Sequence, residues 1–278
     1  MRKILFFISL LSFLSADVLL LSTYTKDSIK DEDLKDFVMS EKYDGVRAIW
    51  DGKNLYTRNK HKIQAPKFFT QHFPNFRLDG ELFMDRKSFD RLSSIVRSFD
   101  VNETQWLDIK YMVFDVPDVD DTLKLRLQKL KNYLDEHKEA NKFIKIIEQK
   151  DVKSKENLQK FADEIHSLGG EGVVLRNNLA RYEKTRSKNA FKLKKYEEAD
   201  CIVKGYIKGK GKYENMLGAI LCEAVIEGES KLIKIGSGFS DELRKNPPSI
   251  NSKIRYKFNG YTKNKLPRFA VFKGIRAD

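Results

Sequence analysis

The string from Glu41 to Arg47 reads EKYDGVR, and its lysine, Lys42, could act as a covalent nucleophile. Lys42 comes just before Asp44-Gly45, a typical tight turn. An unprotonated lysine amine attacks phosphorus well, but a free lysine near neutral pH is almost entirely ammonium. Burial and neighbouring cations lower the pKa of such an amine, so we expect other basic side chains near Lys42. A string this short also occurs by chance in surface hairpins, so alone it leaves both interpretations open.

Four further strings contain acidic, aromatic or basic residues of the kinds found in phosphate-binding sites. They are Leu78 to Leu82, Tyr111 to Asp115, Glu171 to Arg176 and Phe191 to Lys194. Asp79 and Glu81 are two apart, so their carboxylates share one face if the chain is extended there. Lys192 and Lys194 also share a face, which is costly unless an anion lies between them. Each string has a simpler interpretation as solvated charge or core. Together they indicate a pocket with one nucleophile, carboxylates for a divalent metal and cations for phosphates.

In their order along the chain, these strings resemble the motifs of the covalent nucleotidyltransferase superfamily, and within it the ATP-dependent DNA ligases. Lys42 with Asp44, Gly45 and Arg47 matches the nucleophile motif. The next motifs match at Thr57-Arg58-Asn59, Asp79-Gly80-Glu81, Val113-Phe114-Asp115, Glu171-Gly172-Val173-Val174 and Lys192-Leu193-Lys194. The resemblance continues through Gly209 to Lys212, Gly236 to Phe239, Pro267 to Phe269 and Arg276. No residues remain for a separate DNA-binding domain, so the chain is similar to the minimal, secreted bacterial ligases.

The resemblance implies a reaction in three transfers. Lys42 attacks the α-phosphate of ATP, expels pyrophosphate and holds AMP; AMP passes to the 5′-phosphate of a nick in double-stranded DNA, and the 3′-hydroxyl displaces it. The residues implied to bind the nucleotide are Glu41 and Phe114 at the base, Arg47 and Arg58 at phosphate or ribose, Glu81 at the ribose or a metal, and Lys192 and Lys194 at the α-phosphate. Glu171 and Glu81 are the implied ligands of Mg²⁺ (or Mn²⁺), which suits an oxygen-lined site that also holds phosphates.

The elements that must position these residues form an α+β pattern up to residue 198. Strands are predicted from Val38 to Trp50 and from Leu55 to Arg58, joined by a hairpin at Asp51-Gly52. Apolar side chains at helical spacing predict helices through Phe89 to Val96, through Leu123 to Leu134, and after a cap at Ser154 through Leu158 to Leu168. With the resemblance, this pattern predicts a nucleotidyltransferase (adenylation) domain over residues 17–198, made of antiparallel sheets with flanking helices.

The last part of the chain, residues 199–278, differs from the first in its predicted secondary structure and in its charge. Short strands broken by glycine are predicted at Cys201 to Ile207, Ala219 to Ile226, Leu232 to Ile235 and Lys253 to Phe258. Strands at this spacing predict a small all-β barrel such as an OB-fold. This part holds 16 basic and 8 acidic residues, and its loops place DNA-binding candidates at Lys208, Lys210, Lys212, Lys263 and Lys265.

Composition limits the classes of protein that fit. The chain has 278 residues, 41% of them hydrophobic, which excludes a wholly disordered chain and a polytopic membrane protein. A formal net charge of +13 favours a polyanionic partner such as nucleic acid. Only Cys201 and Cys222 are present, which excludes a disulfide-dense scaffold and a four-thiolate zinc site but leaves their pairing open.

The amino terminus has the three parts of a secretory signal peptide. Arg2 and Lys3 precede an apolar and serine run from Ile4 to Leu14, and Ser15-Ala16 end it. We expect residues 1–16 to be removed and the mature chain to work in the periplasm as a monomer, without stable membrane association. A buried first strand or helix is the alternative.

Three other functions fit parts of this pattern. An RNA ligase or a GTP-using capping enzyme has the same lysine motif. A non-enzymatic OB-fold protein that coats single strands would explain the charge but not Lys42 together with Glu171 and the lysine pair.

Overall fold

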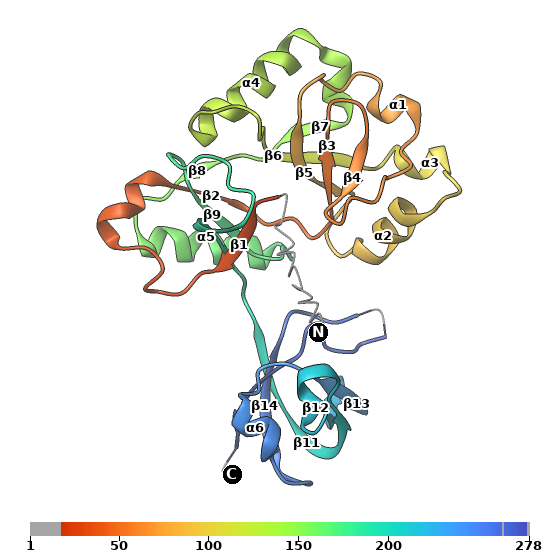
Figure 1. Ribbon diagram of the computed structural model, residues 1–278, viewed down its shortest axis with the longest axis vertical. Helices are drawn as coiled ribbons and strands as arrows, with labels where there is room; N and C mark the ends of the chain where they lie inside the picture. Colours follow the sequence, from red (N-terminus) through yellow and green to blue (C-terminus); the bar gives the residue numbers. More distant parts are fainter. Residues whose placement is uncertain (1–17, 263, 277–278) are drawn as a thin grey trace, which may run out of the picture. The chain divides into compact units, whose positions relative to one another are not determined.

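The computed structural model describes residues 18–262 and 264–276. The chain divides into two compact units after Lys194 (Figure 1), whereas the sequence placed this boundary after Glu198. The proposed signal peptide and Lys263 lie outside the described residues. Among the helices of the described part, none is both long and apolar enough to span a bilayer.

One of two five-stranded sheets in the first unit carries the strands that flank Lys42 and Glu171. Its strand order is β1-β10-β9-β2-β8. The bounds are β1 (Leu20–Thr23), β10 (Arg186–Leu193), β9 (Val173–Asn177), β2 (Phe37–Glu41) and β8 (Lys150–Asp151). Helix α5 (Lys155–Ser167) packs on this sheet through Leu158, Phe161 and Ile165.

The other sheet of the first unit has the order β4-β3-β5-β6-β7. Its strands are β4 (Leu55–Thr57), β3 (Val46–Trp50), β5 (Leu78–Phe83), β6 (Lys110–Asp115) and β7 (Ile144–Ile146). Its apolar core includes side chains of α2 (Phe89–Arg97), α3 (Glu103–Trp106) and α4 (Leu123–Glu136). The shorter helices are η1 (Asp31–Asp36), α1 (Lys67–Thr70) and η2 (Lys138–Lys142). The expected antiparallel pairing holds for the other strand pairs of the two sheets, whereas β1 pairs with β10 and β6 pairs with β7 in parallel.

The predicted helices and the β3–β4 hairpin are confirmed. The side-chain oxygen of Ser154 accepts a hydrogen bond from the backbone N–H of Asn157 and so caps α5. Gly52 has a φ of +99°, and Asp51 accepts two backbone hydrogen bonds in the turn. Leu168 does not belong to the buried stripe predicted for α5, because it follows the helix end and is 56% exposed.

The predicted single strand from Val38 to Trp50 is wrong, and the error bears on Lys42. The chain leaves one sheet at Glu41 and enters the other at Val46. A Cβ on Gly45 would lie 2.1 Å from the carbonyl oxygen of Leu82, so only glycine lets the backbone enter the second sheet so closely. The segment that carries Lys42 therefore crosses from one sheet to the other.

The second unit is built on a five-stranded antiparallel sheet with the order β13-β12-β11-β14-β15. Its strands are β11 (Glu197–Lys208), β12 (Leu217–Ile226), β13 (Glu229–Ile235), β14 (Lys253–Phe258) and β15 (Val271–Ile275), with short helices η3 (Gly211–Tyr213) and α6 (Asp241–Lys245). The predicted strands are confirmed, but within the described residues the sheet is not a closed barrel. An isolated parallel bridge between Ser237 and Val271 links the two edges within the described residues.

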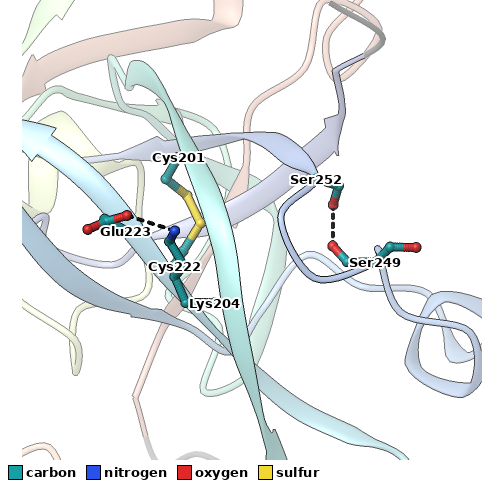
Figure 2. Close-up of a disulfide and its surroundings, with 6 residues drawn as sticks. All are labelled: Cys201, Lys204, Cys222, Glu223, Ser249 and Ser252. Carbon is teal, nitrogen blue, oxygen red and sulfur yellow. Dashed lines mark hydrogen bonds and ion pairs between the residues drawn. A yellow bond between two sulfur atoms is a disulfide. The ribbon is translucent and has the colours of Figure 1, made fainter.

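A disulfide joins the two cysteines of the second unit. Cys201 on β11 and Cys222 on β12 have an S–S distance of 2.12 Å and a Cα–Cα distance of 5.8 Å. Figure 2 shows the bridge between the two strands, beside the ion pair of Lys204 and Glu223 at 3.0 Å. Both cysteines are buried, so the disulfide forms part of the core of this unit.

Candidate active site

A cavity of about 330 Å³ in the first unit is lined by residues from both sheets. The residues that the sequence assigned to the nucleophile and the nucleotide all line it, namely Glu41, Lys42, Arg47, Arg58, Glu81, Phe114, Lys192 and Lys194. They are spread over β2, the crossing segment, β3, the residue after β4, β5, β6 and the end of β10. The cavity therefore collects side chains that are distant in the sequence.

Lys42 and Lys194 share the carboxylate of Glu171. The Nζ of Lys42 donates to Oε2 of Glu171 at 2.5 Å, and Lys194 forms an ion pair with Oε1. Gly172 allows this arrangement, because it has a φ of +150° and a Cβ there would lie 2.3 Å from the carbonyl oxygen of Leu193. The close approach of β9 to the end of β10 brings Glu171 and Lys194 together.

The pKa of Lys42 differs from the sequence-based expectation. Burial acts to lower it, but the Glu171 carboxylate and, more weakly, Glu81 raise it above its ordinary value. The expected cations are nearby, yet their effect falls on Lys192, whose pKa is lowered by burial and then by Lys194 and Lys42. The expectation of a lowered pKa at Lys42 is wrong here, because a carboxylate contacts its Nζ directly. At rest, Lys42 is an ammonium group.

Glu81 is a half-buried acid at the same cavity. It pairs across the strands with Arg47, in the register between β3 and β5. Burial raises the pKa of Glu81 to about 8, against the opposing effects of Lys42 and Arg47. Near neutral pH this carboxyl therefore holds a proton that it would release to an arriving cation.

Arg47 is held by Asp79, and Asp79 is itself bound by a residue that the sequence analysis missed, Tyr182. Asp79 accepts hydrogen bonds from Nε and Nη2 of Arg47 at 3.0 and 2.6 Å, and from the hydroxyl of Tyr182 at 2.6 Å. The Arg47 guanidinium lies 5.3 Å from the centre of the Phe114 ring. Tyr182 is a single tyrosine in the loop between β9 and β10, so no local pattern in the sequence could have indicated it.

A buried ion cluster holds the strand end beside Phe114. Asp115 accepts from Arg126 at 2.7 and 3.1 Å and from Arg176, and Arg176 also donates to the carbonyl oxygen of Phe114 at 2.9 Å. Burial would raise the pKa of Asp115, but Arg176 and Arg126 lower it. The sequence analysis assigned no role to Arg176 and did not identify Arg126, for which the position among the leucines of α4 was the available signal.

Two other candidates have distinct surroundings. The Glu41 carboxylate is bound by Nη2 of Arg86 at 2.8 and 2.9 Å, a partner that the sequence analysis did not identify. Arg58 is an exposed residue at the cavity.

Across residues 18–262 and 264–276, no group of three or more His, Cys, Asp or Glu side chains could hold a metal ion. Glu171 and Glu81 are thus a pair of carboxylates and no larger cluster.

The DNA-binding candidates lie in the second unit. Lys208, Lys210, Lys212 and Lys265 are exposed. Lys265 forms an ion pair with Glu227 at 2.9 Å, and Lys212 lies 4.6 Å from the ring centre of Tyr213. Lys265 is thus partly neutralised in this state.

Comparisons with known proteins give a consistent result for both units. Residues 20–194 match the ATP dependent DNA ligase domain family, and residues 208–276 match the DNA ligase OB-like domain family. A DNA ligase of Haemophilus influenzae is 44% identical over 269 residues, which cover 97% of this chain and 96% of that protein. A solved structure from a study of Lig E DNA ligases has a TM-score of 0.84 at 35% identity, covering 93% of this chain and 98% of that one. A Chlorella virus DNA ligase-adenylate shares the fold, with a TM-score of 0.56 at 22% identity over 94% of this chain and 99% of that one.

Proposed function

This chain belongs to the ATP-dependent DNA ligases, and from that we propose that it seals nicks between 3′-hydroxyl and 5′-phosphate ends through an adenylate on Lys42. The observation that carries the assignment of Lys42 is its contact with Glu171 at a cavity of about 330 Å³. Small-molecule sites ordinarily have volumes of about 300–1,000 Å³, so a nucleotide is a reasonable occupant. The family matches favour a DNA ligase over the RNA ligase, the capping enzyme and the single-strand-binding protein.

In the first step, Nζ of Lys42 bonds to the α-phosphorus of ATP while the α–β phosphoanhydride bond breaks and pyrophosphate leaves. Nζ must first lose a proton, and Oε2 of Glu171 lies at hydrogen-bond distance to accept it. Lys192 and Lys194, at the same cavity, would stabilise the negative charge of the phosphates.

In the second step, an oxygen of the 5′-phosphate attacks the lysyl-AMP phosphorus, and the broken P–N bond returns the amine to Lys42. In the third step, the 3′-hydroxyl attacks the 5′-phosphate and AMP leaves. The adenosine stays in one pocket throughout, where Phe114 stacks on the base, Glu41 recognises it, and Arg47 and Arg58 bind phosphate or ribose.

The carboxylates fit a magnesium or manganese ion that shares its coordination with substrate. Mg²⁺ is commonly held by one or two carboxylates together with substrate phosphates, and Glu171 and Glu81 supply two. Both raise the pKa of Lys42, and the Glu171 carboxylate also raises the pKa of Glu81. A bound metal ion would neutralise charge on the phosphates.

We further propose that the second unit binds the sugar-phosphate backbone of nicked duplex DNA. Exposed lysines stand at 208, the last residue of β11, and at 210 and 212 shortly after it, where Gly211 has a φ of +58° and open space around it. Backbone and ammonium groups there can approach phosphates closely. We expect the protein to bind a nick as a monomer.

We propose that the enzyme is exported to the periplasm, where the signal peptide over residues 1–16 is removed. The disulfide between Cys201 and Cys222 supports this proposal, because such bonds persist in oxidising compartments and are rare in the cytosol.

Labelling with ATP carrying a radioactive α-phosphate tests the nucleophile. The wild-type chain should form a covalent adduct that is acid-labile and alkali-stable, as a phosphoramidate is, and GTP should not replace ATP. Lys42→Ala and Lys42→Arg should both abolish the adduct, because arginine stays protonated. Lys53→Ala, at an exposed turn of the same unit, is the matched control and should keep it. An adduct that survives Lys42→Ala would refute the assignment.

A further inference from the structure

A closed ring of four hydrogen-bonding residues joins the start of the described chain to the body of the first unit. The backbone N–H of Leu19 donates to the hydroxyl of Tyr182 at 3.1 Å, and that hydroxyl donates to Asp79 at 2.6 Å. Asp79 also accepts from two nitrogens of Arg47. The third nitrogen, Nη1 of Arg47, donates to the carbonyl oxygen of Leu19 at 2.6 Å and completes the ring.

The ring connects both sheets of the first unit. Arg47 lies on β3 and Asp79 on β5, whereas Leu19 precedes β1 and Tyr182 lies between β9 and β10. Asp79 is fully buried, and the Tyr182 hydroxyl serves as both donor and acceptor. Losing the Tyr182 hydroxyl would remove the hydrogen bond of the Leu19 N–H and one of the three that Asp79 accepts, and a buried polar group that loses its partner costs more than the net gain from forming the bond.

The segment held by the ring is one wall of the nucleotide cavity. Leu19, Leu20 and Leu21 line that cavity together with Arg47 and Phe114. The same segment continues into β1, where Thr23 pairs with Lys192 on β10. The first residues of the described chain therefore complete the pocket, although no sequence motif includes them.

We propose that Tyr182 is a positioning residue that fastens residues 19–21 as a wall of the adenylate pocket and, through Asp79, holds Arg47 against Phe114. The proposal rests on the proposed function, because the adenylate is the ligand in question. Lys42 is hydrogen-bonded to Glu171, which is not a member of the ring. Loss of the Tyr182 hydroxyl should therefore weaken ATP binding and leave the chemical step at Lys42 nearly intact.

Tyr182→Phe removes one oxygen atom and keeps the aromatic ring. In the adenylylation of Lys42, we expect the KM for ATP to rise about tenfold, as for a buried group that loses its partner. We expect kcat to stay within about threefold, because uniform binding is lost rather than an interaction made only in the transition state. Tyr133→Phe is the matched control: its hydroxyl donates to the carbonyl oxygen of His72 at 3.1 Å in the same unit, and its KM should not change.

A shortened chain provides a second measurement. A chain that begins at Ser22 lacks the wall, and it should show a raised KM for ATP relative to one that begins at Asp17. Both changes act on one network. In the shortened chain, Tyr182→Phe should therefore raise the KM for ATP much less than it does in the full-length chain. If the shortened chain does not fold, the separation of KM from kcat in the full-length variant decides the question.

The proposal is overturned if Tyr182→Phe leaves the KM for ATP within about twofold of wild type, which is less than the loss of a buried hydrogen bond predicts. It is also overturned if KM is unchanged while kcat falls with thermal stability, since that result indicates a purely structural role. The wild-type adduct separates this proposal from the proposed function. No adduct in the wild-type chain would refute the ligase mechanism, whereas an adduct with unchanged KM in the variant would refute only the role of Tyr182.

Discussion

Replacing Glu81 with glutamine tests whether the cavity holds this carboxyl in its protonated form. The ordinary pKa of a glutamate is 4.5, and burial raises that of Glu81 to about 8. Between these values the folded protein binds a proton that the unfolded chain has released, so the free energy of unfolding should fall as the pH rises. Glutamine has nearly the same shape and does not ionise. The free energy of unfolding of Glu81→Gln should therefore not fall with pH in this way.

The size of the effect follows from the two pKa values. One pKa unit corresponds to about 1.4 kcal/mol, so a rise from 4.5 to about 8 amounts to about 5 kcal/mol in total. The difference in unfolding free energy between Glu81→Gln and wild type should therefore shift in favour of the variant by about 4 kcal/mol between about pH 5 and pH 9. Domains are commonly stable by about 5–15 kcal/mol, so this shift is large enough to measure.

Urea unfolding of both proteins at several pH values measures this difference. Glu103→Gln, at an exposed position on α3, is the control and should show a difference from wild type that does not vary with pH. Glu81→Gln should also raise the magnesium concentration needed for the adduct, because an amide is a weaker ligand than a carboxylate. A stability difference between Glu81→Gln and wild type that is constant from pH 5 to pH 9 would refute the reasoning.

Three further predictions concern DNA binding, the buried ion cluster and export. Raising salt from about 50 to about 200 mM should weaken nick binding at least tenfold while adduct formation changes only a few-fold, because phosphate contacts release counterions. Replacing Lys208, Lys210 and Lys212 with alanine should flatten that slope in equilibrium binding, and nick binding that is indifferent to salt would contradict the prediction. Arg126→Met should lower the free energy of unfolding by about 3–5 kcal/mol in urea titrations, because it breaks a fully buried ion pair; a loss below about 1 kcal/mol would show that the pair is not needed. In a Gram-negative host, N-terminal sequencing of the periplasmic protein should find a start near Asp17, and an intact chain in the cytosol would overturn that expectation.

Local patterns were sufficient to predict the three longest helices, the β3–β4 hairpin and strands β11 to β14. The hairpin at Asp51-Gly52 and the cap at Ser154 were predicted because turns and helix ends depend on residues within a few positions of each other. The crossing at Lys42 was not predicted, although Asp44-Gly45 within Val38 to Trp50 is a typical tight turn. The chain changes sheet there because Gly45 meets the backbone of Leu82, a contact between distant segments.

By itself, the sequence determined which side chains are available to the chemistry: a lysine before a turn, carboxylates, an aromatic residue and a lysine pair, in the order that a ligase requires. Only the tertiary structure decided what each side chain contacts and therefore which of them carry protons. Lys42 remains an ammonium group because Glu171 contacts it, and Glu81 remains a neutral acid because burial raises its pKa. Tyr182 enters the site through a ring that reaches Leu19, a partner 163 positions earlier. Coulombic interactions and desolvation depend on distance and burial in space, and neither can be read from the spacing of residues along a chain.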